Sequence, residues 1–163
     1  MRFSEALEKR FAKFLERYPV KRSALVPMLM YAQDEAGSLT PEVIAEIAAR
    51  LDLTTLQVEE VIGYYSMMRK KPAGRYHLQV CTNISCMLVG AYKLWDHAQK
   101  TLGLKHKECS TDGLFSLEEV ECMGACCWAP AVQVNYDFHH SMTPESFDKL
   151  VEELRKKPAP RSK

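Results

Sequence analysis

The segment YHLQVCTNISC, residues 76–86, determines how the second half of this 163-residue chain is expected to fold. Its first five residues alternate apolar and polar side chains, which predicts a β-strand with one face in a core. The strand delivers Cys81 at its end, and Cys86 follows five residues later. Strand and cysteines therefore belong to one local unit.

A second cysteine pair lies downstream, where Cys122 and Cys126 flank Gly124. A strand predicted from Leu114 to Glu121 leads into this pair, so two strand ends face one another and bring both loops together. Without a secretory signal, short-spaced cysteines are more often metal ligands than disulfide partners. The glycine lets its loop bend towards the sulfurs. Both pairs together predict a metal site.

Spacing alone leaves the chemistry of the thiols open. Structural zinc accepts four cysteines at such spacings. A [2Fe-2S] cluster also takes four, although the spacing is not that of plant-type ferredoxins. A dithiol redox site normally needs two intervening residues, and neither pair has them. A Rieske centre needs histidines in the loops, whereas the five histidines lie outside them and are interpreted as structural or surface groups: His77, His97, His106, His139 and His140.

Composition indicates a globular protein, with 47% hydrophobic residues. The net charge of +1, from 22 basic and 21 acidic residues, gives no global field that favours nucleic acid or an anionic membrane. No targeting sequence and no window of membrane-spanning length are seen, so direct membrane insertion is not expected. We expect a reducing, cytoplasm-like compartment.

The N-terminal 70 residues predict a helical bundle. Apolar residues recur at three- and four-residue steps between residues 4 and 18, and Pro19 ends this helix. Further helices are expected to begin after caps at Ser23, Thr40 and Thr54. The basic run from Arg69 to Arg75 contains a proline and a glycine and is interpreted as a connector. We therefore expect a helical docking domain over 1–70, a second domain over 71–157 and a disordered tail over 158–163.

The second domain is predicted to have the order β-α-β-β-β-α. Helical spacing places Cys86 at or just before the start of a long helix that ends at Gly103. Short strands follow at 132–134 and 138–139, and Thr143 caps a last helix. The expected fold class is α+β or α/β, with a mixed sheet and helices packed against it.

Three segments resemble a known family: CTNISC at 81–86, DGLFSLEEVECMGAC at 112–126 and APAVQVN at 129–135. They look like the thioredoxin-like [2Fe-2S] ferredoxins that form the E subunit of NADH:quinone oxidoreductase, respiratory complex I. The resemblance covers most of the chain and implies iron rather than zinc. It assigns one [2Fe-2S] cluster to the matching cysteines, namely Cys81, Cys86, Cys122 and Cys126.

Two departures from the family pattern bear on these ligands. Met123 stands where leucine is usual, and Cys127 directly follows the last ligand, where it could substitute for it. In an extended backbone, the side chain of Cys127 would point away from that of Cys126. Cys109 lies before a turn and far in sequence from either loop. We expect Cys109 and Cys127 to be dispensable.

The resemblance also implies a place in a complex. The protein would dock on the FMN- and NADH-binding flavoprotein subunit, beside the large iron–sulfur subunit, on the cytoplasmic side of a bacterial inner membrane. The seven glycines form no nucleotide-binding fingerprint, so no NADH or flavin site is expected on this chain. Alternatives are the small subunit of an NAD-linked hydrogenase or formate dehydrogenase, a stand-alone thioredoxin-like ferredoxin and a zinc-stabilised binding module.

Overall fold

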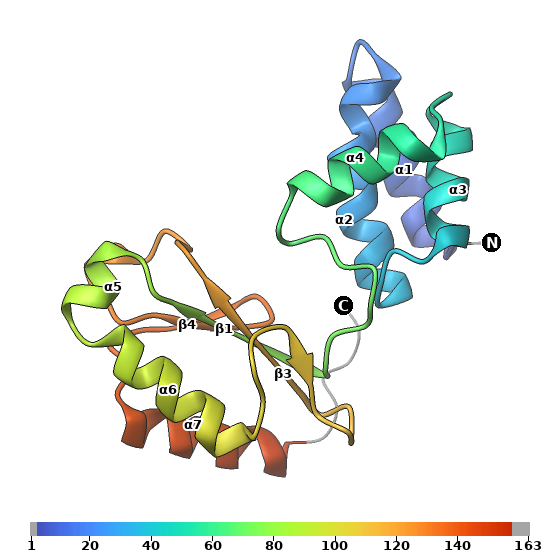
Figure 1. Ribbon diagram of the computed structural model, residues 1–163. Helices are drawn as coiled ribbons and strands as arrows, with labels where there is room; N and C mark the ends of the chain where they lie inside the picture. The colour runs from blue at the N-terminus through green and yellow to red at the C-terminus, as the bar shows by residue number, and fades with distance from the viewer. Residues whose placement is uncertain (1–2, 158–163) are drawn as a thin grey trace. The chain divides into compact units, whose positions relative to one another are not determined.

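The computed structural model describes residues 3–157, so the expected tail at 158–163 lies outside the described residues. The chain divides into two compact units that meet at Pro72 and Ala73. Figure 1 shows an all-helical N-terminal unit and a second unit in which a sheet carries helices. Each unit has its own hydrophobic core.

The N-terminal unit consists of short amphipathic helices whose apolar faces meet in one core. Two of the predicted caps are confirmed, because the hydroxyl of Thr40 accepts from the N–H of Val43 and that of Thr54 from the N–H of Gln57. Gln57 reciprocates by accepting the N–H of Thr54. The helices are α1 (Glu5–Arg17), α2 (Leu25–Ala36), α3 (Pro41–Arg50) and α4 (Thr55–Tyr64).

The start of α2 differs from the prediction. Ser23 lies inside a 3-10 turn, Lys21–Ala24, and Ala24 rather than Ser23 occupies the cap position, with no side-chain hydrogen bond. The 3-10 turn runs directly into α2, so the helix begins without a serine side chain to cap its first N–H groups. At the other end Gly37 terminates α2 in the left-handed region, as predicted.

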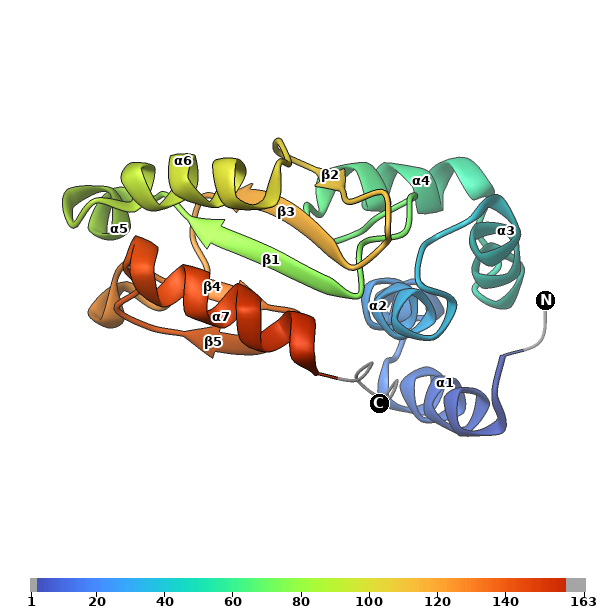
Figure 2. The same ribbon diagram turned by 90° about the horizontal axis from the view of Figure 1, so that it is seen from below.

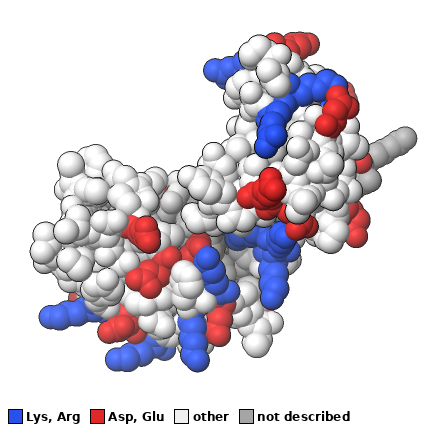
Figure 3. All heavy atoms as spheres, turned by 45° about the horizontal axis from the view of Figure 1, so that its top comes forward, with Lys and Arg blue, Asp and Glu red and all other residues white. Residues whose placement is uncertain are grey.

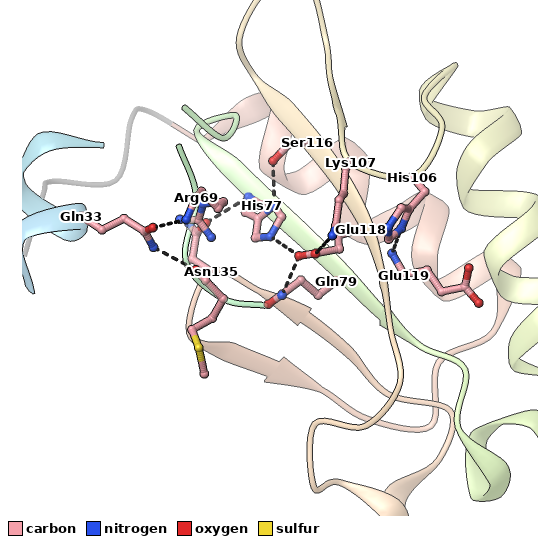
Figure 4. Close-up of polar contacts among 11 residues, drawn as sticks. Gln33, Arg69, His77, Gln79, His106, Lys107, Ser116, Glu118, Glu119 and Asn135 are labelled. Carbon is pink, nitrogen blue, oxygen red and sulfur yellow. Dashed lines mark hydrogen bonds and ion pairs between the residues drawn. The ribbon is translucent and has the colours of Figure 1, made fainter. Parts of the chain in front are cut away.

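A buried glutamine fixes the end of the N-terminal unit. The amide of Gln33, on α2, accepts the N–H of Arg69 at 2.6 Å and donates to the carbonyl of Met67 at 3.1 Å (Figure 4). Because Gln33 is only 6% exposed, these bonds satisfy a polar group inside the core. The segment that leaves α4 is thereby held against α2.

The second unit is built on a mixed sheet with strand order β2-β3-β1-β4-β5. β1 and β3 are parallel, and the other neighbours are antiparallel. A parallel pair needs a crossover, which the two helices between these strands supply. The elements are β1 (Tyr76–Cys81), α5 (Ile84–Leu88), α6 (Ala91–Leu102), β2 (Glu108–Cys109), β3 (Phe115–Val120), β4 (Val132–Val134), β5 (Asp137–His139) and α7 (Pro144–Lys156).

Both long helices cover one face of this sheet. Figures 1 and 2 show α6 and α7 side by side on the same side of the strands. Leu78 of β1 and Leu117 of β3 are fully buried in the core with Phe147 of α7 and Leu94 of α6. This two-layer packing confirms the expected α+β class and leaves strand ends free to form loops.

The opposite face of the sheet carries a buried polar network. His77 of β1 lies 2.8 Å from the hydroxyl of Ser116 and 3.0 Å from the carboxylate of Glu118, which also accepts from Gln79 (Figure 4). Burial raises the pKa of Glu118, but hydrogen bonds from His77 and Gln79 outweigh it and the net shift is downward. His77 is therefore a structural residue, as expected.

The connector glycine has a packing role as well. A Cβ at Gly74 would lie 2.6 Å from the backbone N of Ser116 and 2.7 Å from the carbonyl O of Phe115. The backbone at Gly74 therefore lies directly against the backbone of β3. Two residues later, the N–H of Tyr76 donates to the carbonyl of Leu114. Only glycine fits there.

Two predictions about this unit are wrong in detail. The strand β2 is absent from the predicted order. It has only two residues, Glu108 and Cys109, and both are exposed, so no pattern of apolar and polar residues marks it as a strand. It lies at the edge of the sheet. The helical stretch after Cys86, predicted as one helix, is two helices. Cys86 lies inside the five-residue α5, and Gly90, in the left-handed region, separates α5 from α6.

Candidate metal centre

The two cysteine loops leave the same edge of the sheet. Cys81 is the last residue of β1 and pairs in register with Val120, the last residue of β3. Because the strands are parallel, their carboxyl ends meet at one edge. The N–H of Cys81 also bonds to the carbonyl of Ala131 at 3.1 Å, which brings in the segment after the second pair. The topology thus assembles both loops as predicted.

Hydrogen bonds join the loops to each other. The N–H of Thr82 donates to the carbonyl of Val120 at 3.0 Å, and its hydroxyl donates to the carboxylate of Glu119 at 2.8 Å. Asn83 caps α5 by accepting the N–H of Ile84. The two contacts of Thr82 were not predicted, because nothing in the sequence pairs Thr82 with Glu119, 37 residues away.

The second pair is held by a tight turn. The sulfurs of Cys122 and Cys126 lie 3.9 Å apart, and the N–H of Gly124 donates to the sulfur of Cys122 at 3.4 Å. Gly124 has φ +82°, in the left-handed region that favours glycine. The prediction that this glycine bends the loop towards the sulfurs is confirmed.

The two pairs differ in exposure. Cys81 and Cys86 are buried, at 3% and 2% exposure, whereas Cys122 and Cys126 are exposed. The buried pair lies among small apolar side chains, including those of Ala91, Ala125 and Ala131. The thiols therefore form a site with a dry inner side and an outer side at the surface.

The thiols perturb one another. Burial, with the neighbouring Cys81, raises the pKa of Cys86 to about 11. Hydrogen bonding with Cys122 and repulsion from its charge raise the pKa of Cys126, while a hydrogen bond from Ser85 acts in the opposite direction. Both shifts mean that thiolates here need a compensating cation. Coordination to a metal supplies one.

The donor set fits a two-iron cluster. A [2Fe-2S] cluster spreads four cysteine ligands over two irons, and the chain offers an inner and an outer pair of thiols.

Comparisons with known proteins bear on the identity of this site. The family model described as thioredoxin-like [2Fe-2S] ferredoxin matches residues 11–155. The chain belongs to this family. The family is defined by a [2Fe-2S] cluster on a thioredoxin-like fold, so the predicted fold and cofactor are confirmed.

Individual relatives of this ferredoxin are subunits of one class of enzyme. It is 43% identical over 139 residues to the E 2 subunit of the NADH-quinone oxidoreductase of Rhizobium meliloti, covering 85% of this chain and 83% of the relative. It is 40% identical over 149 residues to the E subunit of the same enzyme from Mycobacterium bovis, covering 91% of this chain but 59% of that longer protein.

A solved structure shares the fold. A chain of an NAD+-reducing [NiFe]-hydrogenase in the H2-reduced state matches with a TM-score of 0.71 over 83% of this ferredoxin and 23% of that chain. The sequence identity is only 18%, so this likeness concerns the fold alone.

No helix within residues 3–157 has the length and apolar character to cross a membrane.

The remaining two cysteines, Cys109 and Cys127, lie in different elements. Cys109 is in the exposed edge strand β2, on the far side of β3 from β1. Cys127 follows Cys126 in a 3-10 turn, Cys126–Trp128, so the backbone there is not extended. The turn is closed by the N–H of Trp128, which donates to the carbonyl of Ala125 at 3.0 Å.

Replacing Cys109 or Cys127 with alanine is expected to leave the cluster intact. Cys109 lies in β2, which β3 separates from β1, and Cys127 is not among the four cysteines that match the family pattern. The visible and EPR spectra of each purified variant check this. If Cys127→Ala abolished the EPR signal while Cys126→Ala left it unchanged, the ligand assignment at that position would be wrong.

Proposed function

We propose that this ferredoxin is the electron-transfer subunit of the NADH dehydrogenase module of an NADH:quinone oxidoreductase. The observation that carries the proposal is the 43% identity to the E 2 subunit of the Rhizobium meliloti enzyme over 85% of the chain. The chain would act as part of an oxidoreductase and carry no NADH or flavin site of its own.

The four cysteines have distinct roles in this proposal. Cys81, Cys86, Cys122 and Cys126 would hold the [2Fe-2S] cluster, which supplies one-electron transfer when bound. The buried Cys81 and Cys86 exclude water from the inner side. The N–H of Gly124 donates to the sulfur of Cys122, and with the cluster bound this hydrogen bond would stabilise the thiolate and raise the reduction potential of the cluster.

The partners follow from the same proposal. The FMN- and NADH-binding flavoprotein subunit would exchange electrons with the cluster, and the large iron–sulfur subunit would complete the module. The module would be peripheral on the cytoplasmic side of the inner membrane. The hydrogenase alternative is less well supported, because the likeness to the hydrogenase chain is at 18% identity.

A reduction assay tests this function. NADH alone is expected to leave the visible spectrum of the oxidised ferredoxin unchanged under anaerobic conditions. Adding a catalytic amount of the purified FMN-containing subunit should then bleach it. Bleaching by NADH without the flavoprotein would contradict the absence of a nucleotide site, and no bleaching with it would contradict the proposed partner.

The N-terminal helical unit is proposed to help bind the flavoprotein subunit. It contains no cysteine and has its own core, so it contributes to association rather than to the cluster. A fragment beginning at Lys71 is expected to keep its [2Fe-2S] spectrum and to bind the flavoprotein at least about tenfold more weakly, roughly 1.4 kcal/mol. Titration of the full-length protein and of the fragment against the purified flavoprotein subunit checks this. Equal affinities would remove the docking role, and loss of the cluster would show one folding unit.

A further inference from the structure

The two segments that carry the thiols contain no charged side chain, although Glu119 and Glu121 lie just before Cys122. These segments are residues 81–92 and 122–136, and 26% of the whole chain is charged. Figure 3 shows the end of the second unit as a largely white surface, with lysines, arginines and carboxylates gathered away from it. A protein surface of this kind is typical of an interface rather than of a face left in water.

Exposed apolar side chains occupy this surface. Several large side chains in the two uncharged segments are between 39% and 76% exposed: Ile84, Met87, Leu88, Val89, Tyr92 and Trp128. They are continuous in space, because α5 contacts the 3-10 turn that carries Trp128. The outer thiols Cys122 and Cys126 belong to the same loops. A partner that covered these side chains would come close to the cluster.

One groove interrupts this apolar surface. It is open, has a volume of about 440 Å³, and lies between the α5–α6 junction, the loop at Pro130 and the start of α7. Most of its lining is apolar, including Leu88, Val89 and Met142. Lys93 is the single charged residue among the nine that line it.

Lys93 gives the groove its one charged lining side chain. Lys93 is exposed and lies in the first turn of α6, which has Gly90 at its cap position. The amides of that turn add their partial positive charge to the ammonium group. The carboxylate of Glu145, in the first turn of α7, lies outside the lining but is hydrogen-bonded to the lining residue Thr143, which lowers the pKa of Glu145. An apolar groove with one cation favours an apolar segment that carries one carboxylate.

We propose that this groove receives a carboxylate-bearing segment of the flavoprotein subunit, with Lys93 as its charge partner. This inference rests on the proposed function and names where the partner binds. The chain's own residues 158–163, PAPRSK, contain no acidic side chain to fill the groove. A second copy is also disfavoured, because a two-fold interface centred here would bring two Lys93 side chains together.

Charge reversal at Lys93 tests the proposal. In the full-length holoprotein, Lys93→Glu is expected to weaken binding to the purified FMN-containing subunit at least tenfold, with an unchanged visible spectrum. Lys100→Glu is the matched control, because Lys100 is an exposed lysine seven residues along the same helix, roughly 10 Å away along its axis. Lys93→Met is expected to lose most of the salt dependence of binding that the wild type shows.

The outcomes separate this proposal from the function on which it rests. If the wild type fails to bind the flavoprotein, the proposed function is wrong. If the wild type binds and both Lys93→Glu and Leu88→Asp bind equally well, the groove is not the binding surface and the function stands. The Leu88→Asp variant places a charge on a side chain that is 76% exposed, so it tests the surface even if Lys93→Glu disturbs the fold. Equal weakening by Lys100→Glu would show a general charge effect and overturn the role of the groove.

Discussion

Replacing Cys86 with serine is expected to abolish the [2Fe-2S] cluster or to leave only a small, unstable fraction of it. Cys86 is 2% exposed and lies among small apolar side chains, so neither water nor another residue's thiol can take its place easily. A hydroxyl is a harder and poorer ligand for iron than a thiolate. Iron and sulfide content per chain, with the visible spectrum, measures the loss.

The exposed ligands provide a graded comparison. Cys126→Ser is also expected to lose the cluster, but a residual amount would indicate that the adjacent Cys127 replaces it in the double-cysteine turn. Cys109→Ser is the control, since Cys109 lies in the edge strand β2. A Cys86→Ser protein with full iron, sulfide and spectrum would contradict the assignment of Cys86.

The second large effect is expected at Gly74. Substituting alanine would place a Cβ against the backbone of Phe115 and Ser116 in β3. The backbone of β3 cannot move there without disturbing its pairing with β1. Overpacking of this kind costs about 1–3 kcal/mol and occasionally more. Denaturant unfolding of the anaerobic holoprotein, followed by the cluster absorbance and by circular dichroism, measures the change in the free energy of unfolding.

Gly63 is the matched control for Gly74. It lies near the end of α4 in ordinary helical backbone, and no atom lies within 4 Å of the position that a Cβ would take. Gly63→Ala is therefore expected to be neutral or to stabilise by up to about 1 kcal/mol. A Gly74→Ala protein as stable as the wild type would show that β3 yields to the extra methyl group.

Local signals explain what could be predicted from the sequence. The caps at Thr40 and Thr54 and the stop at Gly37 follow from chemistry within a few residues, and all three are present. The alternation before Cys81 predicted β1, and the parallel pairing with β3 then brings the cysteine loops together. The family and its cofactor followed from the resemblance of the loops rather than from spacing, which left zinc open.

The errors arise where neighbours in space outweigh neighbours in sequence. Leu88 shares the helical spacing of α6, yet it is 76% exposed, because the left-handed Gly90 breaks the helix and turns α5 towards the second loop. The strand β2 forms only because β3 offers it an edge. The bond between Thr82 and Glu119 likewise depends on register, which a single sequence does not reveal.

Metal and sulfide analysis of the anaerobically purified protein tests most directly whether its thiols hold a [2Fe-2S] cluster. A [2Fe-2S] ferredoxin should contain about two irons and two acid-labile sulfides per chain and give a one-electron EPR signal after reduction. Stoichiometric zinc without sulfide would contradict it.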